Sequence, residues 1–171
     1  MMGGAMALNA RAAGFEVAVH DLRKEMAAAH IKAGATWADS VEDAGRDADV
    51  VLTSLPGPRE VKAVAEGLIK TMRPGTAWFD LSTNSPTVVR ELHKRFAEKG
   101  VSVLDAPVSG GPGGAKSGKM ALWVGGDQAV FDRCRKVLDA LGDQVIYIGA
   151  IGAGSVAKLV HNCAGYAMQL A

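Results

Sequence analysis

The sequence lacks most of the features that mark membrane, secreted or nucleic-acid-binding proteins. No apolar run among its 171 residues approaches the roughly 18 residues of a transmembrane helix. No charged segment followed by an apolar stretch marks a signal peptide. The net charge is only +1, which gives no reason to expect a nucleic acid or an anionic membrane as a partner. We therefore expect a cytoplasmic protein that binds neither.

Cysteine is also scarce, whereas glycine is abundant. Cys134 and Cys163 stand alone and lack the spacing of a metal site, so we expect two reduced thiols and no bound metal. The 21 glycines suit a fold with many tight turns around a ligand. With 49% hydrophobic and 22% charged residues, the chain has the composition of a soluble globular domain.

Hydrophobic periodicity predicts strands that alternate with helices along the whole chain. The run 49–55 is nearly all apolar, which is typical of a strand buried on both faces. Ser85 and Pro86 mark a helix start, as a cap and a first helical residue. The expected strands cover residues 16–20, 49–55, 76–81, 101–104, 119–125 and 145–148. The expected helices cover residues 3–13, 23–33, 38–45, 59–71, 86–100, 127–141 and 155–171. This alternation predicts a mostly parallel sheet with helices on both faces.

A glycine-rich segment, residues 105–118 (DAPVSGGPGGAKSG), follows one of the expected strands. We expect it to be a loop. The hydroxyl of Ser109 and the backbone N–H groups of Gly110 and Gly111 could hold an anionic group such as a carboxylate. The alternative is that these residues form only a tight structural turn.

A second block, residues 152–162 (GAGSVAKLVHN), places Lys158 and Asn162 one helical turn apart on the same face. A lysine and an amide beside an anion cradle, here residues 109–111, are typical of a site that acts on a small hydroxy acid. The alternatives are a lysine that extends from an apolar face to solvent and a buried helix amide. His161 lies about 60° around the helix from Lys158, so we do not count it as catalytic.

Together the two blocks resemble the β-hydroxyacid dehydrogenase family, which includes 3-hydroxyisobutyrate dehydrogenases, tartronate semialdehyde reductases and, more distantly, 6-phosphogluconate dehydrogenases. The resemblance implies a Rossmann-type, doubly wound α/β fold. It also implies an NAD(P)-dependent oxidoreductase that interconverts a small β-hydroxy acid and its semialdehyde or keto acid. In this reading Lys158 is the general base in oxidation and the general acid in reduction, Asn162 orients the substrate, and residues 109–111 bind its carboxylate. The apolar neighbours of Lys158 favour partial burial, which lowers the pKa of a lysine.

The resemblance covers the whole chain but only part of the family's length. The family's nucleotide-binding turn reads Gly-Leu-Gly-x-Met-Gly-x-x-Met-Ala-x-Asn, and residues 2–9 match only its second half. The first, central strand is therefore missing, and we expect a gap in the sheet. We predict an incomplete NAD(P)-binding domain at 1–150 and the start of an interdomain helix at 151–171, from a longer protein that forms homo-oligomers. The alternative is a short native protein that repairs its sheet by swapping or dimerising.

The expected end of the second strand carries an acidic residue, Asp21, 18 residues beyond Gly3. A carboxylate there can bind both ribose hydroxyls and repel a 2′-phosphate, which favours NAD over NADP. The nearby Arg23 weakens this preference, and Asp21 could instead only cap the next helix. The resemblance implies cofactor contacts at Met2, Gly3, Leu55, Pro56 and Thr83. Ordinary strand-end and turn chemistry is the alternative for the last three.

The resemblance also distinguishes between the reactions that relatives of this family catalyse. The 6-phosphogluconate dehydrogenase pattern Lys-x-x-His-Asn-x-x-Glu-Tyr has Gly165 in place of its glutamate, which argues against a decarboxylating reaction. Imine reductases on a similar scaffold generally lack the lysine, so Lys158 argues against them. A catalytically inactive module that binds the cofactor or assembles with partners is the alternative function. We expect no turnover from the 171-residue chain alone, because its nucleotide-binding turn is halved.

Overall fold

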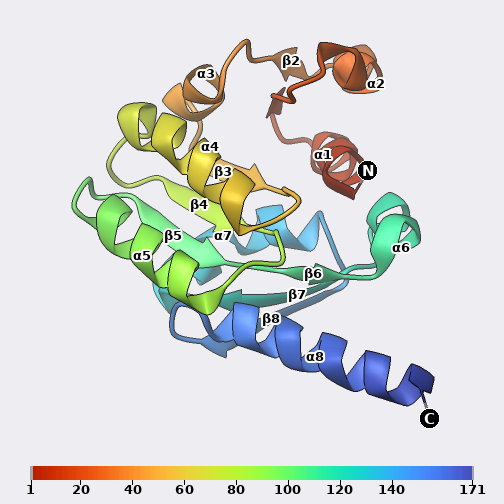
Figure 1. Ribbon diagram of the computed structural model, residues 1–171. Helices are drawn as coiled ribbons and strands as arrows, with labels where there is room; N and C mark the ends of the chain where they lie inside the picture. The colour runs from red at the N-terminus through yellow and green to blue at the C-terminus, as the bar shows by residue number, and fades with distance from the viewer. Residues whose placement is uncertain (1, 171) are drawn as a thin grey trace.

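The computed structural model describes residues 2–170 and shows an α/β fold with its strands in two sheets (Figure 1). The strands are β1 (Ala18–Val19), β2 (Thr36–Trp37), β3 (Val50–Thr53), β4 (Ala77–Asp80), β5 (Ser102–Asp105), β6 (Val108–Ser109), β7 (Ala121–Gly125) and β8 (Gln144–Gly149). The helices are α1 (Met2–Ala12), the 3-10 helix η1 (Lys24–Ala27), α2 (Ala28–Lys32), α3 (Val41–Arg46), α4 (Pro58–Thr71), α5 (Pro86–Ala97), α6 (Gly111–Ser117), α7 (Gln128–Asp139) and α8 (Ala153–Leu170).

The larger sheet has six strands in the order β3-β4-β5-β7-β6, with β8 paired to β7. Strands β3, β4 and β5 are parallel, as are β7 and β8, whereas β7 runs antiparallel to β5 and β6. Strands β1 and β2 form a separate parallel pair. The predicted Rossmann-type α/β fold is confirmed, although the sheet is mixed. The expected gap is also observed, since no ladder within residues 2–170 joins the two sheets.

The core has two layers, one on each face of the larger sheet. Trp78 and Phe79 are neighbours on β4, so their side chains point to opposite faces of the sheet. Both are fully buried, because each face is covered. Trp78 packs with Phe96 beneath α4 and α5, which lie side by side in Figure 1. Phe79 belongs to the other cluster, to which α1, α6 and α7 contribute Met6, Ala115 and Leu138. The two layers fix the carboxyl ends of the parallel strands β3, β4 and β5 at one edge of the sheet.

Two sequence predictions for this region were wrong. Strand β3 is not buried on both faces: Val50, Val51 and Leu52 are only half-buried, because β3 is an edge strand with β4 as its one neighbour among the described residues. The glycine-rich segment 105–118 is not simply a loop, since it contains β6 and the short helix α6. The sequence did not predict that helix, because glycine and proline have low helix propensities.

Several boundaries also differ from the predicted ones. Strand β2 was not predicted, the expected helix 23–33 is divided into η1 and α2, and the expected helix 86–100 ends at Ala97. Ser85 occupies the predicted cap position of α5, but its side chain makes no capping hydrogen bond. Met1 and Ala171, the outer limits of the two predicted domains, lie outside the described residues.

Helix α8 runs along the sheet and continues past it (Figure 1). Only Gly154, Ser155 and Lys158 of this helix are buried, whereas Tyr166 and Met168 are largely exposed. Even so, neither α8 nor any other helix within residues 2–170 combines the length and the apolar character that a bilayer span requires.

Candidate functional site

The loops that follow β3 and β4 are joined directly. The backbone N–H of Leu55 donates a hydrogen bond of 2.9 Å to Oγ of Ser82. Thr53 pairs with Asp80 in the parallel register, so both loops leave the sheet at its carboxyl edge. Two of the predicted cofactor residues, Pro56 and Thr83, are exposed at this edge, and a third, Leu55, is half-buried.

A buried carboxylate supports these two loops from below. Asp80 accepts hydrogen bonds from Oγ1 of Thr53 (3.0 Å), from the backbone N–H of Ser82 (3.1 Å) and from Nδ2 of Asn84 (2.8 Å). The indole N–H of Trp78 donates in turn to Oγ1 of Thr53. Burial raises the pKa of Asp80, and the hydrogen bonds that it accepts oppose this effect. The network fixes the backbone of both loops, and sequence analysis did not identify it.

The start of α1 lies at the same edge. A Cβ atom on Gly3 would lie 3.1 Å from Cβ of Ser54, so this helix packs closely on the chain that follows β3. The carbonyl oxygen of the next residue, Gly4, lies 2.9 Å from Nε2 of His30. The predicted cofactor residues Met2 and Gly3 are thus near the loop that carries Leu55 and Pro56.

Asp21 follows β1 and is partly exposed. Its Oδ1 atom accepts a hydrogen bond of 3.0 Å from the backbone N–H of Arg23, the residue that precedes η1. This contact therefore supports the alternative interpretation, in which Asp21 caps the next helix. The contact occupies Oδ1 alone, so it does not conflict with a second role for the carboxylate.

The end of β5 holds the first turn of α8. Oδ1 of Asp105 accepts the backbone N–H of Gly152 at 2.7 Å, and its Oδ2 accepts that of Ser155 at 2.6 Å. Asp105 is almost completely buried. A Cβ atom on Gly154 would lie 2.1 Å from the carbonyl oxygen of Trp123, so α8 approaches the backbone of β7 as closely as only glycine permits. Because Asp105 pairs with Asp80 in the sheet, α8 begins at the same edge as the cofactor loops.

Lys158 lies one turn beyond Ser155, the second residue in the clamp that Asp105 forms with Gly152 and Ser155. It is buried, with 8% of its surface exposed, and burial lowers the pKa of its ammonium group. Its Nζ lies 5.8 Å from the ring centroid of Trp123 on β7. The partial burial expected from the sequence is therefore confirmed. Asn162, one further turn along, is half-buried.

The cradle segment is brought to the same helix. Oγ of Ser109, on β6, lies 3.3 Å from Nε2 of His161 on α8, and the tautomer of the histidine decides which atom donates. The rings of His161 and Trp123 have centroids 4.9 Å apart. His161 was left out of the predicted site because of its 60° offset from Lys158. That offset is small enough for both side chains to reach one indole ring.

The two glycines of the cradle have backbones that other residues rarely adopt. Gly110 has φ of 132° and Gly111 has φ of 60°. A Cβ atom on Gly110 would also lie 2.9 Å from Sδ of Met120. These constraints favour the alternative of a tight structural turn at least as much as an anion site, and both are compatible with the contact of Ser109.

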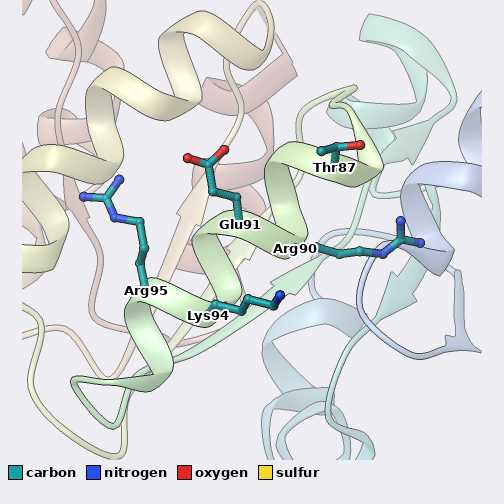
Figure 2. Close-up of a pocket in the computed structure, with 5 residues that line it drawn as sticks. All are labelled: Thr87, Arg90, Glu91, Lys94 and Arg95. Carbon is teal, nitrogen blue, oxygen red and sulfur yellow. The ribbon is translucent and has the colours of Figure 1, made fainter.

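Two surface hollows lie away from these residues. One, of about 430 Å³, follows the outer face of α5 and is lined by Thr87, Arg90, Glu91, Lys94 and Arg95 (Figure 2). Two of these side chains form exposed ion pairs, Glu91 with Lys62 and Arg95 with Glu66, which is typical of a solvated helix face. The other, of about 540 Å³, lies near the amino ends of β3 and β4 and includes Cys134. Burial raises the pKa of that thiol. Neither hollow includes a predicted site residue.

Comparison with known proteins finds relatives that are named as dehydrogenases or oxidoreductases. The chain is 38% identical over 164 residues to the NAD-dependent L-serine dehydrogenase of Pseudomonas aeruginosa, covering 94% of this chain and 55% of that protein. A putative oxidoreductase from Mycobacterium avium superposes with a TM-score of 0.94 at 33% identity, covering 99% of this chain and 61% of the other. The 3-hydroxyisobutyrate dehydrogenase of Mycobacterium tuberculosis, solved with L-serine, has a TM-score of 0.90 at 37% identity over 94% of this chain and 55% of the other.

The chain therefore spans about half the length of the curated relatives that it matches. Residues 1–149 match the family described as the NAD binding domain of 6-phosphogluconate dehydrogenase. A match over most of the chain, together with the Rossmann-type architecture, identifies the fold and the family. The chain belongs to the family of NAD binding domains of 6-phosphogluconate dehydrogenase.

Proposed function

We propose that this chain contributes the cofactor-binding half and the acid–base lysine of an NAD(P)-dependent dehydrogenase for small β-hydroxy acids. One observation carries the proposal. Lys158 is buried, has a lowered pKa and projects from a helix that Asp105 clamps to the carboxyl edge of the sheet. Ligands of doubly wound sheets bind at that edge. The relatives named as NAD-dependent L-serine and 3-hydroxyisobutyrate dehydrogenases support the same chemistry.

The residues at this edge fit a dinucleotide. In our proposal Met2, Gly3, Leu55, Pro56 and Thr83 hold it. Two joined loops with exposed tips face solvent there, on a base fixed by the Asp80 network. On α8, Oγ of Ser155 is buried and has no hydrogen-bond partner among the residues that the structure describes, so it is available to a bound group. When bound, the nicotinamide ring supplies the chemistry of hydride transfer.

The side chains of α8 and β6 handle the substrate. In oxidation, neutral Lys158 accepts the proton of the substrate hydroxyl; in reduction, the ammonium form returns it. A lowered pKa increases the neutral fraction of Lys158 near neutral pH. Ser109 and the N–H groups of Gly110 and Gly111 hold the substrate carboxylate, and the amide of Asn162 orients the hydroxyl. The contact between Ser109 and His161 brings this cradle beside the lysine helix.

Asp21 favours NAD over NADP in this proposal, because its second carboxylate oxygen can bind the adenosine ribose. Relatives differ in cofactor: a solved structure at 30% identity and a TM-score of 0.91 contains NADP⁺, whereas the L-serine dehydrogenase relative is named NAD-dependent. We also propose that the whole enzyme is cytoplasmic and forms homo-oligomers. The exposed apolar side chains of Val160, Tyr166 and Met168 on α8 support an assembly surface. The isolated chain, with its halved nucleotide-binding turn, is expected to show no turnover.

A hybrid enzyme tests the proposal. The 164-residue matching part of the Pseudomonas aeruginosa 3-hydroxyisobutyrate dehydrogenase is replaced by the corresponding part of this chain, and the relative supplies the rest. We expect NAD⁺ reduction with 3-hydroxyisobutyrate, glycerate or L-serine, and none with the methyl esters, which lack the carboxylate. A folded hybrid that binds NAD⁺ but oxidises none of these acids would contradict the proposed substrate class.

A further inference from the structure

Trp123 lies close to both Lys158 and His161 of α8. Its ring centroid is 4.9 Å from that of His161 and 5.8 Å from Nζ of Lys158. The residue is half-buried on β7, and the carbonyl of the same residue is the atom against which Gly154 packs. The position of the indole is therefore fixed by the sheet and by the close approach of α8.

Few other charged groups face this part of α8. The elements packed most extensively against the helix are β5, β7, β8 and α5, and Ser109 of β6 contacts His161. From β5, Asp105 is engaged by two backbone N–H groups, and from β8, the hydroxyl of Tyr147 donates to the carbonyl of Gly126. From α5, Arg90 donates to the carbonyl of Ile151. Strand β7 contributes no titratable residue.

Lys158 takes part in no ion pair among the residues that the structure describes. The face of an indole ring attracts a cation within about 6 Å, and this attraction strengthens where water is excluded. The ring of Trp123 is thus the electron-rich group that partners the Lys158 ammonium. It also contacts the ring of His161, whose plane is tilted by 47° from that of the indole.

We propose that Trp123 is a positioning residue that holds the Lys158 ammonium and the His161 ring against one indole ring. This inference rests on the proposed function, because it assigns Trp123 a role in placing the lysine that transfers the proton. His161 also touches Ser109. The indole ring therefore connects the lysine to the cradle through two side-chain contacts, one with Lys158 and one with His161.

The first test is the titration of Lys158 by NMR in the 171-residue protein with ¹³C-labelled lysine, with Lys158→Gln used to assign the signal. Two effects of Trp123→Leu have opposite signs. Loss of the ring removes an attraction for the charged form, which lowers the midpoint, whereas the admission of water raises it. We expect the midpoint to fall by about half a pH unit or more, and Trp123→Phe, which keeps a ring, to restore most of the parent value. An unchanged or raised midpoint in Trp123→Leu would overturn the proposal.

The second test leaves Trp123 in place, so it holds even if the leucine variant fails to fold. The indole N–H signal of Trp123 is followed through the same pH range in the parent and in Lys158→Gln, with Lys136→Gln on the exposed side of α7 as the matched control. The signal should move with the titration of Lys158 in the parent and in the control, and it should stay flat near that midpoint in Lys158→Gln. An indole signal that does not follow the lysine in the parent would overturn the proposal. Neither titration needs cofactor or turnover, so an inactive hybrid enzyme with shifted titrations would reject only the proposed function.

Discussion

Asp105 gives the most quantitative prediction, because one buried carboxylate holds the first turn of α8. It accepts two backbone N–H groups at 2.7 Å and 2.6 Å. Hydrogen bonds to a charged acceptor contribute about 1.5–3 kcal/mol each. Asp105→Ala loses both and leaves two N–H groups without an acceptor. We expect it to lower the free energy of unfolding by about 3–6 kcal/mol, a large fraction of the roughly 5–15 kcal/mol of a typical domain.

Asp105→Asn is the more measurable variant. The amide keeps one oxygen for one N–H group, but its NH₂ faces the other donor. We therefore expect a loss of about 2–3 kcal/mol, between the parent and the alanine variant. The assay is urea unfolding followed by circular dichroism, with the slope checked for constancy.

Asp139→Asn on α7 is the matched control, since Asp139 forms an exposed ion pair with Arg135. That change should alter stability by less than about 0.5 kcal/mol. If Asp105→Ala unfolds within 1 kcal/mol of the parent, then the clamp does not hold α8 and the argument for the position of Lys158 fails.

Three further predictions concern α8 and Asp21. Gly154→Ala should cost about 1–3 kcal/mol or more by urea unfolding, because its Cβ would lie 2.1 Å from the carbonyl oxygen of Trp123, whereas Gly113→Ala, with no atom within 4 Å, should be nearly neutral. Lys158→Met should stabilise the fold at pH 7, because burial lowers the pKa of Lys158 in the folded protein below the ordinary 10.5. For the same reason, the stability of the parent should rise with pH from the folded-state pKa toward 10.5. The same rise in Lys158→Met would refute this explanation. In the hybrid enzyme, Asp21→Asn should reduce the ratio of kcat/KM for NAD⁺ to that for NADP⁺ by about tenfold or more; an unchanged ratio would leave Asp21 only its contact with Arg23.

Most of the fold could be predicted from the sequence because the strands and helices carry clear periodicities. The run 76–81 predicted β4, and the spacing of Val130, Cys134 and Leu138 predicted the buried face of α7. The degree of burial was harder to predict. A uniformly apolar β3 was read as an internal strand, but its place in the sheet depends on which strands are its neighbours. Strand order is a non-local property that composition does not encode.

The site shows the same division. Lys158, Asn162 and Ser109 could be named as candidates because their spacing and glycine-rich context are local. The buried acids Asp80 and Asp105 were not, since each follows a strand as an ordinary polar residue until its partners from other segments are known. Trp123 and His161 meet through a contact between β7 and α8. A signal was available for His161, because a residue three positions from Lys158 shares its side of the helix.

The proposed role of Lys158 as the acid–base group of a dehydrogenase is tested by the turnover of Lys158→Ala in the hybrid enzyme with a β-hydroxy acid and NAD⁺. We expect kcat to fall by about 10²–10⁴-fold while the affinity for NAD⁺, measured by calorimetry, changes little. Turnover close to that of the parent hybrid, with NAD⁺ bound equally well, would contradict it.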